Sequence, residues 1–217
     1  MNWIYHDNDV EKRGKLKQVC LQVMSDPAFF PKWYFPKKDK DGKEIKEPAV
    51  MAENLNRENI FVHGKPGSIC GPTYCNLGTD KVCELMEISY ERRKKLFYAR
   101  AHDLEKAWNK PEVWIVTGAD DLYKRCISLE QTGELLRLKE DEAHYWAWCG
   151  EVIFAVAGIN PDYSPRLKSG HITPIWPTDE KESLTVANIG GYNCIKPLFD
   201  RTTFGVKGLT EIRLYKA

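Results

Sequence analysis

The hydrophobic pattern of this chain changes its period at Gly150, and this change constrains the fold more than any other feature. Before Gly150, apolar residues mostly recur at helical spacing among lysines and acidic residues. After it, Val152 to Ala157 form a continuous apolar run, which is typical of a buried strand. Helical patterns followed by strand patterns predict an α+β fold, in which a helical N-terminal part packs on a C-terminal antiparallel sheet.

The patterns predict individual elements along the chain. Helices are expected over residues 9–25, 73–88, 89–108, 120–128 and 134–148, and strands over residues 152–157, 171–176, 184–189 and 209–215. Residues 113–116 form a short apolar segment. We expect the aromatic, proline-broken segment 29–36 to pack along an edge, and residues 36–48, 63–67 and 160–169 to form loops.

Composition and charge exclude several classes of function. The 217 residues are 42% hydrophobic and 29% charged, which is enough for one domain with a sizeable core. The formal net charge is only +1, whereas nucleic-acid-binding proteins usually carry a strongly positive charge. No apolar stretch has the length of a membrane span, and residues 1–7 do not resemble a secretory signal. We therefore expect synthesis in the cytoplasm, without stable membrane insertion.

One cysteine lies in a setting that suits a nucleophile. The chain has seven cysteines, and an odd count in a reducing compartment favours thiols over a disulfide framework. Cys75 lies where the turn formers Gly71 and Pro72 give way to a predicted helix. A helix start offers unpaired N–H groups and the positive end of a dipole, and both favour the thiolate. The backbone N–H of Cys75 is also a candidate oxyanion donor.

Two later residues complete the requirements of a thiol hydrolase. His171 opens a predicted strand directly after Gly170, which is expected to let the chain approach its neighbours closely, and Asn188 lies in the next strand. Cys75 would attack an amide carbonyl, His171 would shuttle the proton, and Asn188 would fix the tautomer of the imidazole. Residues of these types also occur without chemistry, as a small buried hydrophobe or as a strand histidine bonded to a carbonyl.

The sequences around these three residues carry a resemblance to a known clan. Residues 73–82, TYCNLGTDKV, resemble the pattern T-x-C-N-x-x-x-x-D-V, and residues 169–177, SGHITPIWP, resemble G-H-[IV]-A-x-V-x-P. Residues 186–193, VANIGGYN, resemble x-A-[NQ]-x-G-x-x-N. These are motifs of the papain-like cysteine peptidoglycan hydrolases, the CHAP-like clan of amidases and endopeptidases that includes phage endolysins and secreted antibacterial effectors.

The resemblance covers about residues 70–88 and 143–217. It implies that Cys75 is the nucleophile, His171 the base and Asn188 the third catalytic residue, with Asn193 as a competitor for the third position. It also implies a papain-like fold, no cofactor and no metal. On this interpretation residues 1–217 form a single catalytic domain, with residues 1–65 as an N-terminal elaboration and residues 89–140 as a helical insertion.

The chain departs from the clan's pattern at three positions. Lys81 stands where the first motif has an acid, and Asp80 lies one position earlier. Pro174 lacks the N–H that a strand ladder needs, so its strand is expected at an edge there. Gly78, within the predicted helix, is expected to cost stability relative to alanine.

Other chemistry finds weaker support in the sequence. Zinc binding lacks both a C-x-x-C pair and an H-E-x-x-H motif. The acids of residues 140–142 could serve a glycosidase, and the basic run 92–95 could contact an anionic polymer. For both charge runs a solvated helix face is the favoured interpretation. The loop Gly64-Lys65-Pro66-Gly67 lacks the full phosphate-binding pattern.

The resemblance implies a cysteine hydrolase that cleaves amide bonds of bacterial peptidoglycan, with stem peptides as its partners. The enzyme would act on the cell wall, either as an endolysin released through a holin-type membrane pore or as an effector delivered by secretion machinery. A sugar–peptide amidase and a stem-peptide endopeptidase need the same triad, so both activities fit. The alternatives are a cytoplasmic cysteine amidase, protease or transferase with another substrate, and a non-catalytic interaction protein on the same scaffold.

Overall fold

A computed structural model describes most of the predicted core of the chain. The described residues are 7–26, 74–100, 102, 105–106, 109, 112, 114–160, 170–178, 184–189, 193–199, 204 and 209–217. The predictions for residues 29–36, 36–48, 63–67 and most of the loop 160–169 lie outside the described residues. So does most of the proposed N-terminal elaboration.

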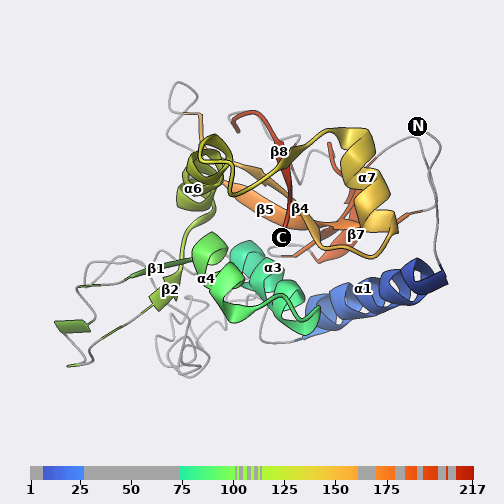
Figure 1. The fold of residues 1–217 in the computed structure, drawn as a ribbon, viewed down its shortest axis with the longest axis horizontal. Coiled ribbons are helices and arrows are strands. Elements are labelled where there is room, and N and C mark those ends of the chain that lie inside the picture. The colour runs from blue at the N-terminus through green and yellow to red at the C-terminus, as the bar shows by residue number, and fades with distance from the viewer. Residues whose placement is uncertain are drawn as a thin grey trace, which may run out of the picture.

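The α+β class is confirmed (Figure 1), although the short strands β1 Tyr98–Arg100, β2 Trp114–Val116 and β3 Arg137–Leu138 interleave with the helices before Gly150. The helices among the described residues are α1 Asp7–Ser25, α3 Tyr74–Leu85, α4 Tyr90–Phe97, α6 Ala119–Gln131 and α7 Glu140–Trp148. The strands of the main sheet are β3 Arg137–Leu138, β4 Ile153–Ala157, β5 His171–Trp176, β6 Thr185–Asn188, β7 Cys194–Pro197 and β8 Arg213–Lys216.

The main sheet has six antiparallel strands in the order β3-β8-β4-β5-β6-β7. A second, two-stranded sheet pairs β1 Tyr98–Arg100 with β2 Trp114–Val116, and it extends away from the main body on the left of Figure 1. β5 lies inside the main sheet, between β4 and β6. The prediction that Pro174 marks an edge is therefore wrong for the strand as a whole.

The apolar run at β4 reflects burial on both faces of the sheet. Phe154 and Val156 belong to a core cluster that α1, α3, α4 and α6 share, whereas Ile153, Ala155 and Ala157 belong to a cluster that α7 shares. All five residues are fully buried. A strand that alternates its side chains between two covered faces needs apolar residues at every position, which explains why the period disappears.

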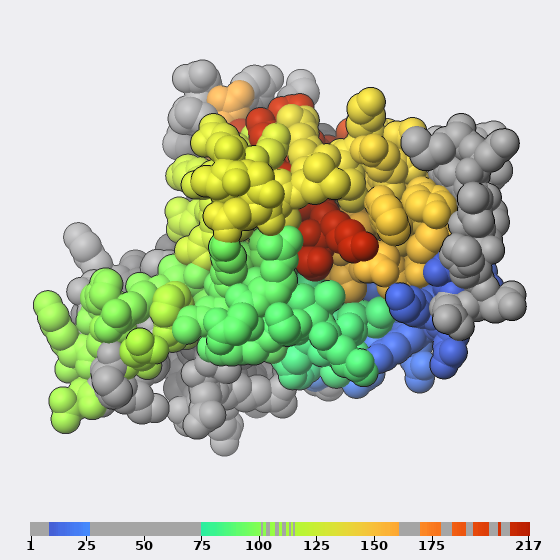
Figure 2. All heavy atoms as spheres, in the orientation of Figure 1, coloured from blue at the N-terminus to red at the C-terminus, as the bar shows by residue number. Residues whose placement is uncertain are grey.

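The surface view in Figure 2 shows how the helices cover the sheet. On this face the green atoms of α3 and α4 adjoin the yellow atoms of residues near 125–150, and C-terminal residues in red show between them. None of the described helices combines the length and apolar character that a bilayer crossing requires. The six described cysteines form no disulfide with one another.

The segment 89–140 differs from the predicted helical insertion. The helix expected over residues 89–108 ends at Phe97, and Tyr98 begins β1. The backbone N–H of Thr117 donates to the carbonyl of Phe97 at 2.8 Å, so pairing with β2 replaces the helical pattern. Residues 137–138 likewise form β3 against β8 and shorten the helix expected over 134–148 to α7. β7 has no counterpart among the predicted strands.

Candidate active site

Cys75 is the second residue of α3 and lies against the start of β5. Its side chain is buried, with 6% of the residue exposed. The backbone N–H of Ile172, the residue that follows His171, and the N–H groups of the helix start are near enough to the sulfur to lower the pKa of the thiol. The thiol donates to Oδ1 of Asn76, with 3.3 Å between Sγ and Oδ1. The fold therefore brings the predicted nucleophile to the peptide unit that joins His171 to Ile172.

A glycine allows α3 to approach the sheet this closely. A Cβ added at Gly78 would collide with the side chain of Ile189, which directly follows β6. Alanine would lack room at this position. Glycine lowers the stability of the helix itself, and the close packing that only glycine permits offsets this cost. Gly78 is one turn beyond Cys75, and its contact with Ile189 fixes the depth at which the thiol meets β5.

His171 and Asn188 lie together on adjacent strands. Nε2 of His171 and Oδ1 of Asn188 are 2.8 Å apart, and Asn188 is only 3% exposed. Because the oxygen of the amide can only accept, Nε2 carries the proton in the neutral ring. Asn193 instead donates to the backbone carbonyl of Met24 at 2.8 Å. Of the two asparagines considered for the third position, the geometry places Asn188 at the histidine.

The opposite nitrogen of the imidazole has no hydrogen-bond partner in the part of the chain that the structure describes. Nδ1 of His171 makes no hydrogen bond to any described residue, and the ring packs against Phe204 with 5.1 Å between centroids. In the neutral tautomer that Asn188 selects, Nδ1 carries the lone pair. This is the atom that would accept a proton from a thiol.

Pro174 interrupts the hydrogen-bond ladder between β5 and β6 near His171 and Asn188. The described pairing of β5 with β6 includes only Ile175 and Trp176, and Pro174 pairs with Phe154 of β4 on its other side. Because Pro174 has no N–H, the hydroxyl of Thr173 donates to the carbonyl of Ala187 instead, at 2.6 Å. The edge-like character expected of Pro174 is therefore real but local, since it interrupts only the ladder to β6.

The predicted close approach at Gly170 is confirmed. A Cβ at this position would collide with the carbonyl oxygen of Ala157 and would lie 3.0 Å from Cα of Gly158. Ala157 is also the partner of His171 in the β4–β5 register. Gly170 thus lies in close contact with the end of β4, and this contact fixes the position of His171 at the start of β5.

The structure does not join Cys75 and His171 by a hydrogen bond. Burial raises the pKa of Cys75 to about 11, although backbone N–H groups of Ile172, Asn76 and Cys75 itself lower it. Burial lowers the pKa of His171 to about 4, while Asn188 raises it and Lys196 lowers it further. The expected effect of the helix start on the thiol is present, but burial outweighs it. At neutral pH the described site therefore holds a thiol and a neutral imidazole.

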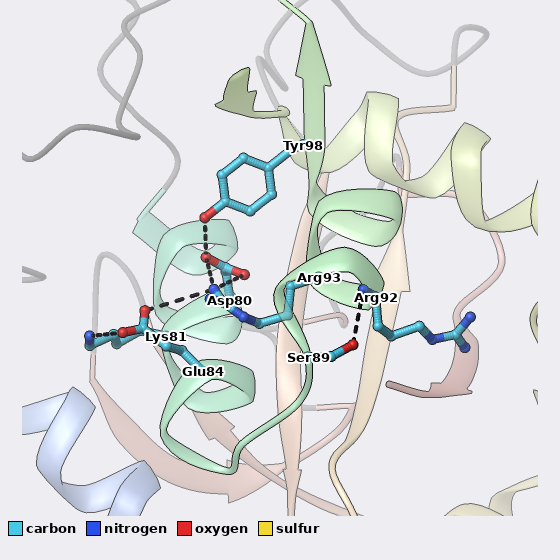
Figure 3. Close-up of polar contacts among 7 residues, drawn as sticks. All are labelled: Asp80, Lys81, Glu84, Ser89, Arg92, Arg93 and Tyr98. Carbon is cyan, nitrogen blue, oxygen red and sulfur yellow. Dashed lines mark hydrogen bonds and ion pairs between the residues drawn. The ribbon is translucent and has the colours of Figure 1, made fainter. Parts of the chain in front are cut away.

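A second buried polar cluster lies further along α3, and sequence reasoning missed it (Figure 3). Nη1 of Arg93 on α4 lies 3.0 and 3.1 Å from the two carboxylate oxygens of Asp80, and the hydroxyl of Tyr98 donates to Asp80 at 2.7 Å. Burial raises the pKa of Asp80, against the lowering effects of Tyr98 and Arg93. The interpretation of residues 92–95 as a solvated face is wrong for Arg93, which is 8% exposed.

The two residues around the departure from the first motif have different surroundings. Asp80 is a buried carboxylate paired with Arg93, whereas Lys81 is exposed enough to pair with Glu84 at 2.7 Å. Glu84 in turn lies 3.7 Å from Arg93. In the sequence, the one available sign of this cluster is that Asp80 on one predicted helix is followed 13 positions later by Arg93 on the next.

The rival sites gain little from the structure. No group of three or more His, Cys, Asp or Glu side chains in the described part of the chain is arranged to hold a metal ion. Glu140 and Asp141 are exposed at the first turn of α7, and Glu142 accepts from the backbone N–H of Lys139 at 2.8 Å. These acids therefore form a solvated helix start. The loop at residues 64–67 lies outside the described residues.

An open groove lies beside the candidate site. Its volume is about 560 Å³, and it runs between the end of α1 and the start of β7, where its lining residues are Leu21, Met24, Ser25, Asn193, Cys194 and Ile195. Neither Cys75 nor His171 lines it. Asn193, which donates to the carbonyl of Met24, is thus one of the residues that line this groove.

Comparison with known proteins adds no relative. No family model matches the chain, and no curated protein or solved structure matches it. The interpretation of the site accordingly depends on the motifs around Cys75, His171 and Asn188 and on the geometry of these residues.

Proposed function

We propose that the protein is a cysteine hydrolase that cleaves amide bonds of bacterial peptidoglycan and lyses the cell wall as endolysins do. Cys75 is the nucleophile, His171 the acid and base, and Asn188 the residue that orients the imidazole. The observation that carries the proposal is the 2.8 Å bond between Nε2 of His171 and Oδ1 of Asn188, at the end of β5 that Cys75 meets. The motif resemblance supplies peptidoglycan as the substrate class.

The proposed reaction has two stages. As the sulfur of Cys75 bonds to the carbonyl carbon, its proton moves to Nδ1 of His171, and the same proton then passes to the leaving amine as the C–N bond breaks. Water next attacks the thioester and gives one proton to His171, and that proton returns to the sulfur when the acid product leaves. Asn188 holds the imidazolium through Nε2 in both stages, so its oxygen stabilises the charged form.

The neutral resting pair must become charged when the substrate binds. A thiol whose pKa is about 11 and an imidazole whose pKa is about 4 do not exchange a proton spontaneously at neutral pH. Proton transfer then accompanies attack on the carbonyl instead of preceding it. The backbone N–H groups at the start of α3 favour this step, because they stabilise negative charge on the sulfur and on the oxyanion.

The direct test is digestion of purified sacculi. We expect the wild-type protein to release soluble fragments, and Cys75→Ala and His171→Ala to release none. Cys194→Ala is the matched control, because Cys194 is partly exposed and takes no part in the proposed chemistry. Mass spectrometry of the fragments identifies the cleaved bond as the sugar–peptide amide or a stem-peptide amide. Fragment release that persists in Cys75→Ala would contradict the proposed nucleophile.

The burial of the thiol favours a second candidate, an interaction protein that uses the same scaffold without catalysis. Only 6% of Cys75 is exposed, as is usual for a structural cysteine. This candidate predicts that no amide substrate is hydrolysed and that biological activity survives in Cys75→Ala. If the protein leaves sacculi undigested but hydrolyses other peptide amides, and this hydrolysis depends on Cys75, the result would instead favour the cytoplasmic amidase or protease.

A further inference from the structure

The residue after the candidate nucleophile makes a contact that the proposed mechanism does not use. Asn76 is a polar residue in the first turn of α3, yet only 1% of it is exposed. A buried side-chain amide is costly unless both of its ends find partners. Asn76 meets this requirement through the thiol of Cys75 at one end and the backbone carbonyl of Thr117 at the other.

The contact with Thr117 fixes the orientation of the amide. A backbone carbonyl only accepts, so the Nδ2 group of Asn76 must face Thr117, and Oδ1 must then face the sulfur. Thr117 is itself held, because its N–H and its hydroxyl both donate to the carbonyl of Phe97, at 2.8 and 3.2 Å. The acceptor that faces Cys75 is therefore anchored where α4 ends and β1 begins.

This arrangement favours a protonated sulfur. The thiol can donate to Oδ1 across 3.3 Å, whereas a thiolate would have no proton to donate and would face the negative end of the amide dipole. Cys75 directs its proton to Asn76, while Nδ1 of His171 takes no proton from any described residue. The resting thiol is thus bonded to the wrong acceptor for catalysis.

We propose that Asn76 is a positioning residue that holds the resting Cys75 thiol in its protonated form, and that breaking this bond is a step in activating the nucleophile. The inference rests on the proposed function, in which the Cys75 sulfur must give its proton to His171. A carbonyl group of the substrate that reaches the sulfur would displace the S–H from Oδ1 and leave it free to turn toward Nδ1. Asn76 therefore keeps the enzyme inactive until an acyl group enters the site.

No charged side chain is among the groups that shift the pKa of Cys75. Among the described elements, β5, α1 and α4 pack most closely against α3, and they bring His171, Cys20 and Arg93 to this region. Cys20 is fully buried, and burial raises its pKa to about 12, so it is uncharged. Arg93 is neutralised by Asp80 of α3 itself (Figure 3). A change in the titration of Cys75 after substitution of Asn76 therefore reports on the amide.

The test follows the alkylation of Cys75 by iodoacetamide from pH 6 to 11, with peptide mapping by mass spectrometry to separate Cys75 from the other cysteines. In Asn76→Ala the midpoint of the rate profile should fall by about one pH unit, since the acceptor that opposes the thiolate is gone. In Asn76→Asp it should rise, because a carboxylate opposes the thiolate more strongly. Better access for the reagent would raise the rate at every pH and leave the midpoint in place.

Thr79→Val is the matched control for structural damage. Thr79 is fully buried, and its hydroxyl donates to the carbonyl of Cys75 at 2.8 Å, so valine removes one bond in the same turn without changing the surroundings of the sulfur. Its midpoint should equal that of the wild type. An unchanged or raised midpoint in Asn76→Ala would overturn the proposal.

A second measurement leaves Asn76 in place and decides the question if Asn76→Ala does not fold. The infrared difference between wild type and Cys75→Ala isolates the S–H stretch of Cys75. We expect it at the lowered frequency of a thiol bonded to an amide carbonyl, and the frequency of a thiol without an acceptor would overturn the proposal. Neither measurement needs a substrate. Failure to digest sacculi would therefore count against the proposed function and leave this test intact.

Discussion

Two polar clusters lie at α3, and they differ in how completely their acceptor atoms are bonded. Asp80 accepts from Arg93 through both oxygens and from Tyr98, so that a buried ion pair ties α3 to α4 and to β1. His171 and Asn188 are uncharged and share one bond, while Nδ1 of the imidazole has no partner among the described residues. In the first cluster both carboxylate oxygens are bonded, although Nε of Arg93 has no partner among the described residues, whereas in the second cluster the lone pair of Nδ1 has none there.

This difference separates a structural role from a chemical one. A buried carboxylate that already accepts from two partners offers little to a substrate, whereas an imidazole nitrogen that carries a lone pair can accept a proton. The two clusters also share an element. Asp80 fixes α3 from one side, and the contact of Gly78 with Ile189 fixes it from the other, so both determine where Cys75 meets β5.

The largest effect is expected from breaking the ion pair. Arg93→Met leaves the carboxylate of Asp80 buried without its cation, and we expect a loss of about 3–5 kcal/mol in the free energy of unfolding, measured with urea. The double variant Asp80→Leu with Arg93→Met should lose less than Arg93→Met alone, because no uncompensated charge remains. A double variant at least as unstable as the single one would show that the pair itself, rather than an orphaned charge, stabilises the fold.

The two clusters were unequally visible in the sequence. Cys75, His171 and Asn188 stand out because each lies at the edge of an element whose start the turn residues and the apolar period mark. Arg93 was hidden in a basic run that resembles a solvated face, and only tertiary contact with Asp80 buries it. Neither the periodicity nor the spacing of a single helix contains information about a partner on another helix.

The segment boundaries failed for a related reason. Residues 98–100 continue a helical pattern, yet they form β1 because residues 114–116 offer a strand to pair with. β7 was missed because none of its residues is buried, and its apolar residue Ile195 is 41% exposed. Local propensity gives way at such places to pairing between distant segments. The α+β class, by contrast, follows from long and strongly periodic stretches that no single tertiary contact reverses.

Acid should destabilise the cluster of His171 and Asn188, because it protonates the buried imidazole. The pKa of His171 is about 4 in the folded chain against an ordinary value of 6.5, so the unfolded state binds a proton that the folded state does not. Stability is therefore full above pH 6.5 and falls as the pH drops from 6.5 towards 4. We expect a loss on the order of 2 kcal/mol, discounted for partial exposure of the ring. Urea unfolding of wild type and His171→Phe at several pH values measures it, and equal slopes in both would contradict the assignment.

The smallest effect distinguishes the two asparagines considered for the third position. Asn188 raises the pKa of His171 through its bond to Nε2, so Asn188→Ala should lower that pKa further, and the lost hydrogen bond should cost about 1 kcal/mol. Asn193→Ala removes a bond to the end of α1 instead and should leave the titration of His171 unchanged. The ring proton signals of His171, followed by NMR from pH 7 to 3, measure the shift.

The pair of variants also tests whether the second cluster acts as a unit. If Asn188 only fills space, Asn188→Ala and Asn193→Ala will lower the free energy of unfolding by similar amounts, and neither will shift the pKa of His171. If it orients the imidazole, Asn188→Ala frees the ring to turn, and the tautomer with the proton on Nδ1 becomes populated. That tautomer cannot accept the proton of Cys75, so digestion of sacculi should slow in Asn188→Ala and continue at the wild-type rate in Asn193→Ala.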